Sequence, residues 1–349
     1  MACRFLSVTA VCLTLGMWCF VNFAGYHNPA SAFLLFLPAW LWCLPALAML
    51  MPALVLDPKR SALMLLATVL LYFGGLLNYS VPWQTNRVAG NVQTLKVMTY
   101  NRGQAQGTSL QPFKLETAPD ILALQDAGRR VAAYQNAEGY REFTHAEGVG
   151  EFVLLSKHPI VGKKLLAFSP AQDAQAAIPV AARFEVAVGG RNVAVYIVHL
   201  PTPRPVLMAE RGGGFLWGIL GIPGTKWAEK RRSRQKYWDG QIELARQLDR
   251  VVREEKLPCI VMGDFNSPAM GTVYRMFSSH LQDTHRAAGS GYGYTFPGVT
   301  RNPLSFFKPW LRLDHIYSDG RNLVATGHKT EPDRGSQHRA VFAELAFSP

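Results

Sequence analysis

The sequence predicts an α+β protein in which about three transmembrane helices precede a soluble sandwich domain. Charge is almost absent from residues 1–80, where the only charged residues are Arg4, Asp57, Lys59 and Arg60. Beyond residue 93, short strand-like runs alternate with turns and a few helices, which favours an α+β sandwich over a doubly wound parallel sheet. We therefore expect a membrane anchor in 1–80, a linker in 81–93 and one domain in 94–349.

Three apolar runs fill the predicted anchor, at Phe5–Phe23, Ala32–Leu56 and Ser61–Leu77. Each is roughly long enough to cross a hydrocarbon core of ~30 Å at about 1.5 Å per residue. The alternative is a bundle of buried soluble helices, but such helices keep a polar face and these runs have none. The second run leaves a kinked span or a re-entrant hairpin open, because it contains Pro38, Pro45 and Pro52.

Basic residues set the expected orientation of the anchor. Arg4 precedes the first run, and Lys59 and Arg60 separate the second from the third. The positive-inside rule places these residues in the cytoplasm, so three crossings put the domain outside the cytoplasmic membrane. The first run could instead be a cleaved signal peptide with Arg4 in its leader, and this alternative leaves the domain on the same side.

The soluble part is strongly basic. Of the 36 basic and 24 acidic residues in the chain, 33 and 23 follow residue 80. Such a balance favours polyanions, namely nucleic acid, anionic lipid headgroups or phosphorylated small molecules, although it also aids solubility.

Strands and one long helix are expected along the domain in a defined order. Apolar runs bounded by turn residues predict strands at Leu95–Tyr100, Ile121–Gln125, Phe152–Ser156, Val180–Val188, Val193–His199, Cys259–Gly263, Arg312–Tyr317, Leu323–His328 and Arg339–Leu345. Helical spacing of apolar residues predicts a helix over Lys226–Glu255,.

Polar side chains that can bind metal or phosphate follow many of these strands. The segments are Met98-Thr-Tyr-Asn101, Ala123-Leu-Gln-Asp126, Val198-His199, Met262-Gly-Asp-Phe-Asn266 and Arg312-Leu-Asp-His315, with Ser336-Gln-His338 before the last strand. A single Asp or Asn after a strand is usually a turn residue. Six such segments in one domain instead predict a rigid polar site at one rim of a sheet.

The order of these segments resembles the endonuclease/exonuclease/phosphatase superfamily, the deoxyribonuclease I-like proteins, in a membrane-anchored bacterial-type form. The likeness runs over about residues 94 to 347, with Thr-Tyr-Asn, Leu-Gln-acid, Gly-Asp-Phe-Asn, Leu-Asp-His and Ser-x-His in sequence. It implies a four-layer α/β/β/α sandwich with two mixed sheets face to face. It also implies phosphoester hydrolysis with Mg²⁺ or Mn²⁺, since phosphoryl transfer needs a hard cation on oxygen ligands.

The resemblance assigns catalytic roles to five residues. Asp264 matches the group that positions or deprotonates the attacking water, with Asn266 beside it. His338 would contact the scissile phosphate and be oriented by Asp314. His199 matches the second phosphate-binding histidine, which would help to protonate the leaving oxygen.

The resemblance also assigns metal ligands, and there the sequence departs from the family pattern. Asn101 and Asp126 match the asparagine and the acidic ligand, but the family usually has Glu in place of Asp126. Gln337 stands where the family usually has Asp, so one carboxylate becomes a neutral amide. We expect weaker cation binding and a single ion at a site that includes Asn101, Asp126 and Gln337.

A basic run after an apolar glycine-rich stretch is the candidate substrate contact. The stretch Gly212–Gly221 is followed by six basic residues interleaved with aromatics, among them Arg231 and Arg234. It predicts a flap that contacts the outer leaflet or binds a polyanion. The alternative is an ordinary loop and a solvated helix face.

The sequence thus predicts a metal-dependent hydrolase of phosphodiesters outside the cytoplasmic membrane, acting on nucleic acid or on a phospholipid headgroup. These two substrate classes are not distinguished by the residues, and no protein partner is implied. The alternative is a catalytically weakened, membrane-tethered module that only binds phosphate groups.

Overall fold

The structure is a computed structural model of the chain, and it describes residues 1–82, 92–103, 110–128, 130–171, 176–209, 226–298, 309–332 and 337–348. Most of the predicted linker and all of the predicted flap Gly212–Gly221 lie outside these residues. The chain divides into two compact units. The first comprises Met1–Ser80, Val206–Trp238 and Ala269–Thr272, and the second comprises Val81–Pro205, Asp239–Pro268 and Val273–Pro349.

Among the described residues of the first unit, three helical stretches are long and apolar enough to cross a membrane, at Ala2–His27, Ala39–Leu56 and Pro58–Leu76. The first stretch consists of α1 (Ala2–Cys19), η1 (Phe20–Ala24) and η2 (Gly25–His27). The second consists of η3 (Ala39–Cys43) and α3 (Leu44–Leu56), and the third consists of α4 (Pro58–Leu70) and η4 (Leu71–Leu76). The second stretch is shorter than the predicted run, because α2 (Pro29–Leu35) is separate and a break at Leu37-Pro38 follows it.

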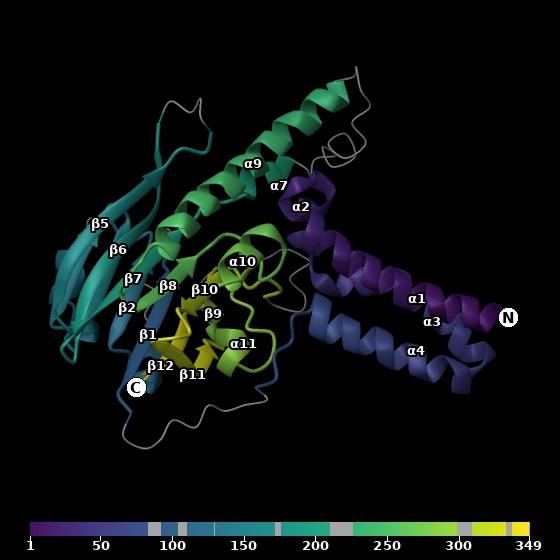
Figure 1. The fold of residues 1–349 in the computed structure, drawn as a ribbon, viewed down its shortest axis with the longest axis horizontal. Coiled ribbons are helices and arrows are strands. Elements are labelled where there is room, and N and C mark those ends of the chain that lie inside the picture. Colours follow the sequence, from purple (N-terminus) through teal and green to yellow (C-terminus); the bar gives the residue numbers. More distant parts are fainter. Residues whose placement is uncertain are drawn as a thin grey trace. The chain divides into compact units, whose positions relative to one another are not determined.

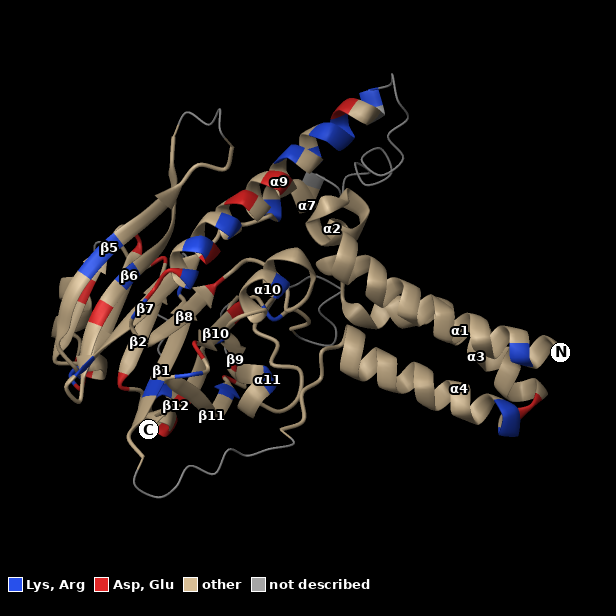
Figure 2. Ribbon diagram, in the orientation of Figure 1, with Lys and Arg blue, Asp and Glu red and all other residues tan. Residues whose placement is uncertain are grey.

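The bundle has apolar side chains outside and small polar ones inside. Phe5, Met51 and Leu63 are exposed, whereas Ser7, Thr14 and Ser61 are buried. The distribution suits helices that pack through small residues in lipid, where large apolar side chains face the hydrocarbon. Figure 2 shows the charges of this bundle confined to one end. The Cys3 thiol lies 3.1 Å from Ser61 Oγ, so Arg4 shares that end with the Asp57–Arg60 turn.

The second unit contains two six-stranded mixed sheets (Figure 1). The first sheet has the order β11-β12-β1-β2-β4-β3 and the second β5-β6-β7-β8-β10-β9. In the first sheet the strands are β1 (Thr94–Asn101), β2 (Ile121–Gln125), β3 (His145–Val149), β4 (Phe152–Ser156), β11 (Leu323–Thr330) and β12 (Val341–Phe347). In the second they are β5 (Ile160–Phe168), β6 (Ile178–Val188), β7 (Arg191–His199), β8 (Cys259–Asp264), β9 (Gln282–Asp283) and β10 (Asp314–Ser318).

The alternation of side chains along each strand separates the core between the two sheets from the outer faces. Successive side chains of a strand point to opposite faces, so Val97 of β1 enters the core between the sheets, where Phe184 and Ile260 of the second sheet also lie. Met98 instead packs with Phe113 and other residues on the outer face of the first sheet. The helices there are α5 (Phe113–Thr117) and α6 (Val131–Asn136).

Helices also flank the second sheet. They are α9 (Lys226–Arg253) and α10 (Gly271–Ser278), whereas α11 (Thr284–Ala288) packs mainly against β11, and α7 (Arg204–Ala209) follows β7. In the part of α9 that belongs to the second unit, Gln241 and Gln247 donate to the carbonyls of Pro201 and Ser169, beyond the ends of β7 and β5. The predicted four-layer α/β/β/α sandwich is therefore confirmed.

Candidate active site

Strand register brings the predicted polar residues to one rim of the sandwich. In the second sheet, parallel pairing places His199 at the end of β7 opposite Asp264 at the end of β8. Antiparallel pairing places Asp314, the first residue of β10, opposite Asp264 as well. In the first sheet, Asn101 ends β1 opposite Gln125. Side chains far apart in the sequence therefore converge, because their strands end or begin at the same rim.

The glycine before Asp264 is needed for this approach. Gly263 has a φ of +142°, and a Cβ atom there would lie 2.1 Å from the carbonyl oxygen of Val198. Only glycine tolerates both that backbone conformation and that contact. The Gly-Asp-Phe-Asn segment thus lets β8 lie against the end of β7, where His199 follows.

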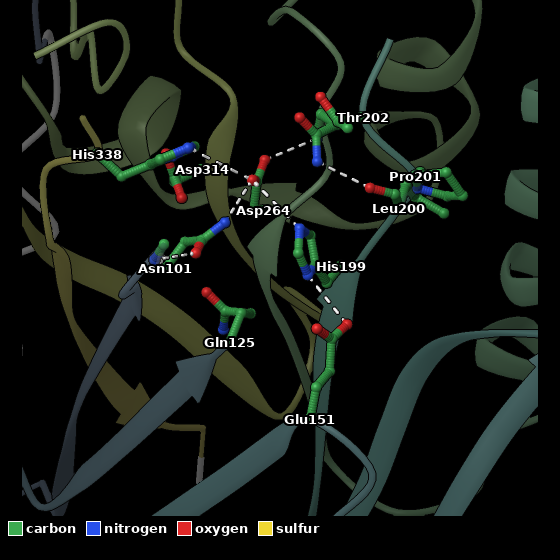
Figure 3. A network of polar contacts seen from close by, with 12 residues as sticks. Asn101, Gln125, Glu151, His199, Leu200, Pro201, Thr202, Asp264, Asp314 and His338 are labelled. Atoms are coloured by element: carbon green, nitrogen blue, oxygen red, sulfur yellow. Dashed lines mark hydrogen bonds and ion pairs between the residues drawn. The ribbon is translucent and has the colours of Figure 1, made fainter. Parts of the chain in front are cut away.

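Asp264 is the centre of the site (Figure 3). Its side chain is 1% exposed, and Oδ2 accepts a hydrogen bond from Asn101 Nδ2 at 2.8 Å. The Nε2 atoms of His199 and His338 lie 3.8 and 3.7 Å from the same oxygen. Burial raises the pKa of Asp264, and the charge of His338 opposes that rise. The carboxyl group therefore faces one amide and two imidazoles in a site with little water.

Each of the two imidazoles is held by a carboxylate on its other nitrogen. His338 Nδ1 lies 3.0 Å from Asp314 Oδ2, and His199 Nδ1 lies 3.0 Å from Glu151 Oε1. Burial alone would lower the pKa of His338, but the charges of Asp314 and Asp264 raise it to about 9. Burial would also lower the pKa of His199, but the hydrogen bond to Glu151 and the charge of Asp264 raise it to about 9. Both pairs therefore favour imidazolium at neutral pH.

Glu151 was not among the residues predicted from the sequence. It follows Gly150 in the turn between β3 and β4, where a lone acidic residue is an ordinary turn residue,. The only signal was its place directly before the strand Phe152–Ser156. In the structure it forms, with Asp126 and His199, a group of side chains whose ligand atoms lie within 4.8 Å of one another.

The carboxyl groups of Asp126 and Glu151, beside His199, have the chemistry of a cation site. Burial raises the pKa of Asp126 against the charge of His199, and the neighbouring Glu151 raises it further. Two carboxyl groups in such contact need a shared proton or a cation. Gln125, which directly precedes Asp126 in the sequence, has a buried Oε1 with no hydrogen-bond partner among the described residues. These donors fit a hard divalent ion such as Mg²⁺ or Mn²⁺.

A second group with ligand atoms equally close contains Asp264, Asp314 and His338. All three are buried, and His338 is already hydrogen-bonded to Asp314. Both groups contain a histidine bound to a carboxylate, and we take the first, which includes the predicted ligand Asp126, as the candidate cation site.

Backbone strain accompanies two predicted residues. Asp126 and Asn266 have φ values of 52° and 45°, which non-glycine residues rarely adopt and which are often stored at functional sites. Asn266 Nδ2 donates to the carbonyl of Leu200 at 2.8 Å, and its backbone N–H donates to Asp264 Oδ1 at 2.8 Å. Asn266 thus joins the ends of β7 and β8 and fixes one oxygen of Asp264.

Three predicted residues lie apart from these contacts. Gln337 precedes His338, but its side chain is exposed and belongs to neither potential metal group among the described residues. Its carbonyl accepts from the N–H of Gly298 at 2.7 Å. Arg231 and Arg234 lie in the part of α9 that belongs to the first unit, whereas the side chains described above belong to the second.

Comparison with known proteins gives one family and several similar folds. The sequence model of the Endonuclease/Exonuclease/phosphatase family matches residues 91–338. A solved protein of this family from Bacteroides thetaiotaomicron is 17% identical, with a TM-score of 0.50, over 74% of this chain and 100% of that chain. A mannosyl-6-phosphatase from the same organism is 17% identical, with a TM-score of 0.47, over 72% of this chain and 100% of that one.

The catalytic domain of human Nocturnin is 18% identical, with a TM-score of 0.45, over 73% of this chain and 94% of that one. Comparison with curated protein sequences finds no match.

Proposed function

The chain belongs to the Endonuclease/Exonuclease/phosphatase family, and from this premise we infer that it is a metal-dependent hydrolase of phosphodiesters. We assign catalysis to residues 94–349, with 1–80 as the membrane anchor and 81–93 as the linker. The observation that carries the proposal is the pair of carboxylate-held histidines that approach one oxygen of buried Asp264. A module that only binds phosphate needs cationic groups, but it does not need two oriented imidazoles around a carboxylate.

The side chains divide the proton transfers of hydrolysis among them. Asp264 orients the attacking water and accepts its proton, because its carboxylate is fixed by Asn101 and by the N–H of Asn266. The imidazolium of His338 donates a hydrogen bond to a phosphate oxygen and stabilises charge there. The imidazolium of His199 gives its Nε2 proton to the leaving oxygen as the bond to phosphorus breaks.

Asp126 and Glu151 would hold the divalent ion, together with the predicted ligands Asn101 and Gln337. A bound Mg²⁺ or Mn²⁺ supplies Lewis-acid polarisation of the phosphate. The substrate is nucleic acid or a phospholipid headgroup, and both suit the positive charge of the chain. Arg231 and Arg234 remain the proposed substrate contacts.

A substrate panel tests the proposal on the full chain in lipid nanodiscs. Turnover of DNA, RNA, sphingomyelin, phosphoinositides and a generic phosphodiester is measured with Mg²⁺, with Mn²⁺ and with a chelator. We expect hydrolysis of at least one substrate that the chelator abolishes. Tight binding without turnover of any substrate would instead identify a phosphate-binding module.

The same preparation tests the metal site by Mn²⁺ binding. Asp126→Ala and Glu151→Gln each remove a charged oxygen ligand, so Mn²⁺ affinity should fall about tenfold or more. Gln337→Asp adds a carboxylate and should raise the affinity for Mg²⁺ if Gln337 contacts the ion. An unmoved titration in Gln337→Asp would exclude Gln337 from the site, and an unmoved one in Glu151→Gln would exclude Glu151.

We propose that the three apolar helices cross the cytoplasmic membrane and that the catalytic domain lies outside it. Support comes from the exposed apolar side chains of the bundle and from the shared end of Arg4 and the Asp57–Arg60 turn,. A reporter enzyme that works only outside the cytoplasm should be active when fused to the C-terminus and inactive when fused after Lys59. The opposite pattern would reverse the topology.

A further inference from the structure

The segment Ala269–Thr272 belongs to the first unit, with the N-terminal helices. Asn78, which follows the third helical stretch, donates from Nδ2 to the carbonyl of Ala269 at 2.8 Å. The N–H of Tyr26, at the end of the first stretch, donates to Thr272 Oγ1 at 3.3 Å. The N–H of Gly271 lies 3.5 Å from Asn22 Oδ1. Residues in or directly after two of the apolar stretches therefore contact three of the four residues of this segment.

The helices and this segment are in close backbone contact at Gly25. Its φ is +47°, and a Cβ atom there would lie 2.2 Å from Thr272 Oγ1 and 2.9 Å from the backbone nitrogen of Thr272. No side chain larger than hydrogen fits without moving Thr272. The neighbouring Tyr26 is fixed as well, because its ring lies 4.6 Å from that of Trp238 and its carbonyl accepts from Gln235.

The same segment continues the catalytic loop. Only Ser267 and Pro268 separate Ala269 from Asn266, which fixes Asp264 through its N–H. Ser267 is itself held, since its carbonyl lies 3.1 Å from His315 Nε2. Two residues span about 7 Å at most, and the proline ring fixes one of their dihedral angles. Because this connection is short and partly fixed, a displacement of Ala269 is transmitted to Asn266.

We propose that the N-terminal helices are a positioning element of the active site, because they hold Ala269–Thr272 and thereby the backbone of Asn266 and Asp264. The proposal rests on the proposed function for its effect on turnover. Gly25, Asn78 and Thr272 are positioning residues that act through the loop. The end of the anchor at Gly25 and Asn78 then positions the active-site loop, in addition to the proposed attachment to lipid.

The test compares Gly25→Ala with Gly16→Ala in the full chain in nanodiscs. A Cβ atom at Gly16, in the same helical stretch, meets nothing within 4 Å, so Gly16→Ala is the matched control. Amide hydrogen exchange of the peptide 262–272 should become at least about tenfold faster in Gly25→Ala and stay unchanged in Gly16→Ala. On a hydrolysed substrate, kcat should fall about tenfold or more in Gly25→Ala while KM stays within about twofold.

Asn78→Asp is a second variant in case Gly25→Ala does not fold. It keeps the size of the side chain and tolerates the φ of 55° at this position, but it removes the N–H donor to Ala269,. It should also speed exchange of the peptide 262–272. Unchanged exchange in both variants would overturn the proposal. Faster exchange in a protein that hydrolyses no substrate would refute the proposed function and leave the positioning intact.

Discussion

Asp264→Asn is expected to lower turnover by ~10²–10⁴-fold, and His338→Ala by a similar factor. The first change removes the proton acceptor and the charge between the two imidazoles while the side chain keeps its size. The second removes the group whose Nε2 lies 3.7 Å from Asp264 and whose Nδ1 is held by Asp314. The measurement is kcat on the hydrolysed substrate, together with the thermal unfolding midpoint of each variant.

Asp239→Asn is the control for the loss of a carboxylate, because Asp239 is exposed on α9. It should leave kcat within about twofold. Near-full turnover in Asp264→Asn or in His338→Ala, with a normal unfolding midpoint, would show that the residue in question has no part in the chemistry.

Arg312→Met is expected to destabilise the fold by ~3–5 kcal/mol, because it leaves a buried carboxylate without its cation. Arg312 Nη1 and Nη2 donate to Asp283 at 2.9 and 2.6 Å, and both side chains are nearly inaccessible to solvent. The hydroxyl of Tyr274 donates to the same carboxylate at 2.7 Å. Urea unfolding of the full chain in nanodiscs, followed by far-UV circular dichroism, measures the change.

Lys163→Met is the matched control, since Lys163 pairs with Glu147 where both side chains are more than 40% exposed. Its cost should stay below about 1 kcal/mol. Burial opposes ionisation of Asp283, yet Arg312 holds its pKa well below the usual value. The stability that the pair contributes is therefore present above pH ~3.9 and lost as the pH falls below it. Equal costs for the two variants at neutral pH would contradict this account.

Much of the polar rim was predictable because Asn101, His199 and Asp264 each end a strongly apolar strand and Asp314 begins one. Apolar runs such as Ile121–Gln125 and Cys259–Gly263 carry the signal of fully buried strands, and the structure has both within one residue. Strand β5 was missed because Lys163 and Lys164 are both exposed and interrupt the apolar alternation.

The structure adds one residue to the predicted site and leaves another out of both potential metal groups among the described residues. Glu151 contacts His199 only because the turn between β3 and β4 lies beside the end of β7, and no local pattern encodes that distance. Gln337 was assigned by its position in a motif, and its exposed side chain shows how little a motif says about orientation. Its role as a ligand stays a prediction.

The position of Asp264 opposite both His199 and Asp314 limits how such a sequence can diverge. A single-residue insertion or deletion inside β7, β8 or β10 would turn the following side chains to the other face of the sheet. The reactive groups would then point into the apolar core or away from one another. Lineages of this protein should therefore vary by substitution within these three strands, and differences in length should collect in the loops that join them.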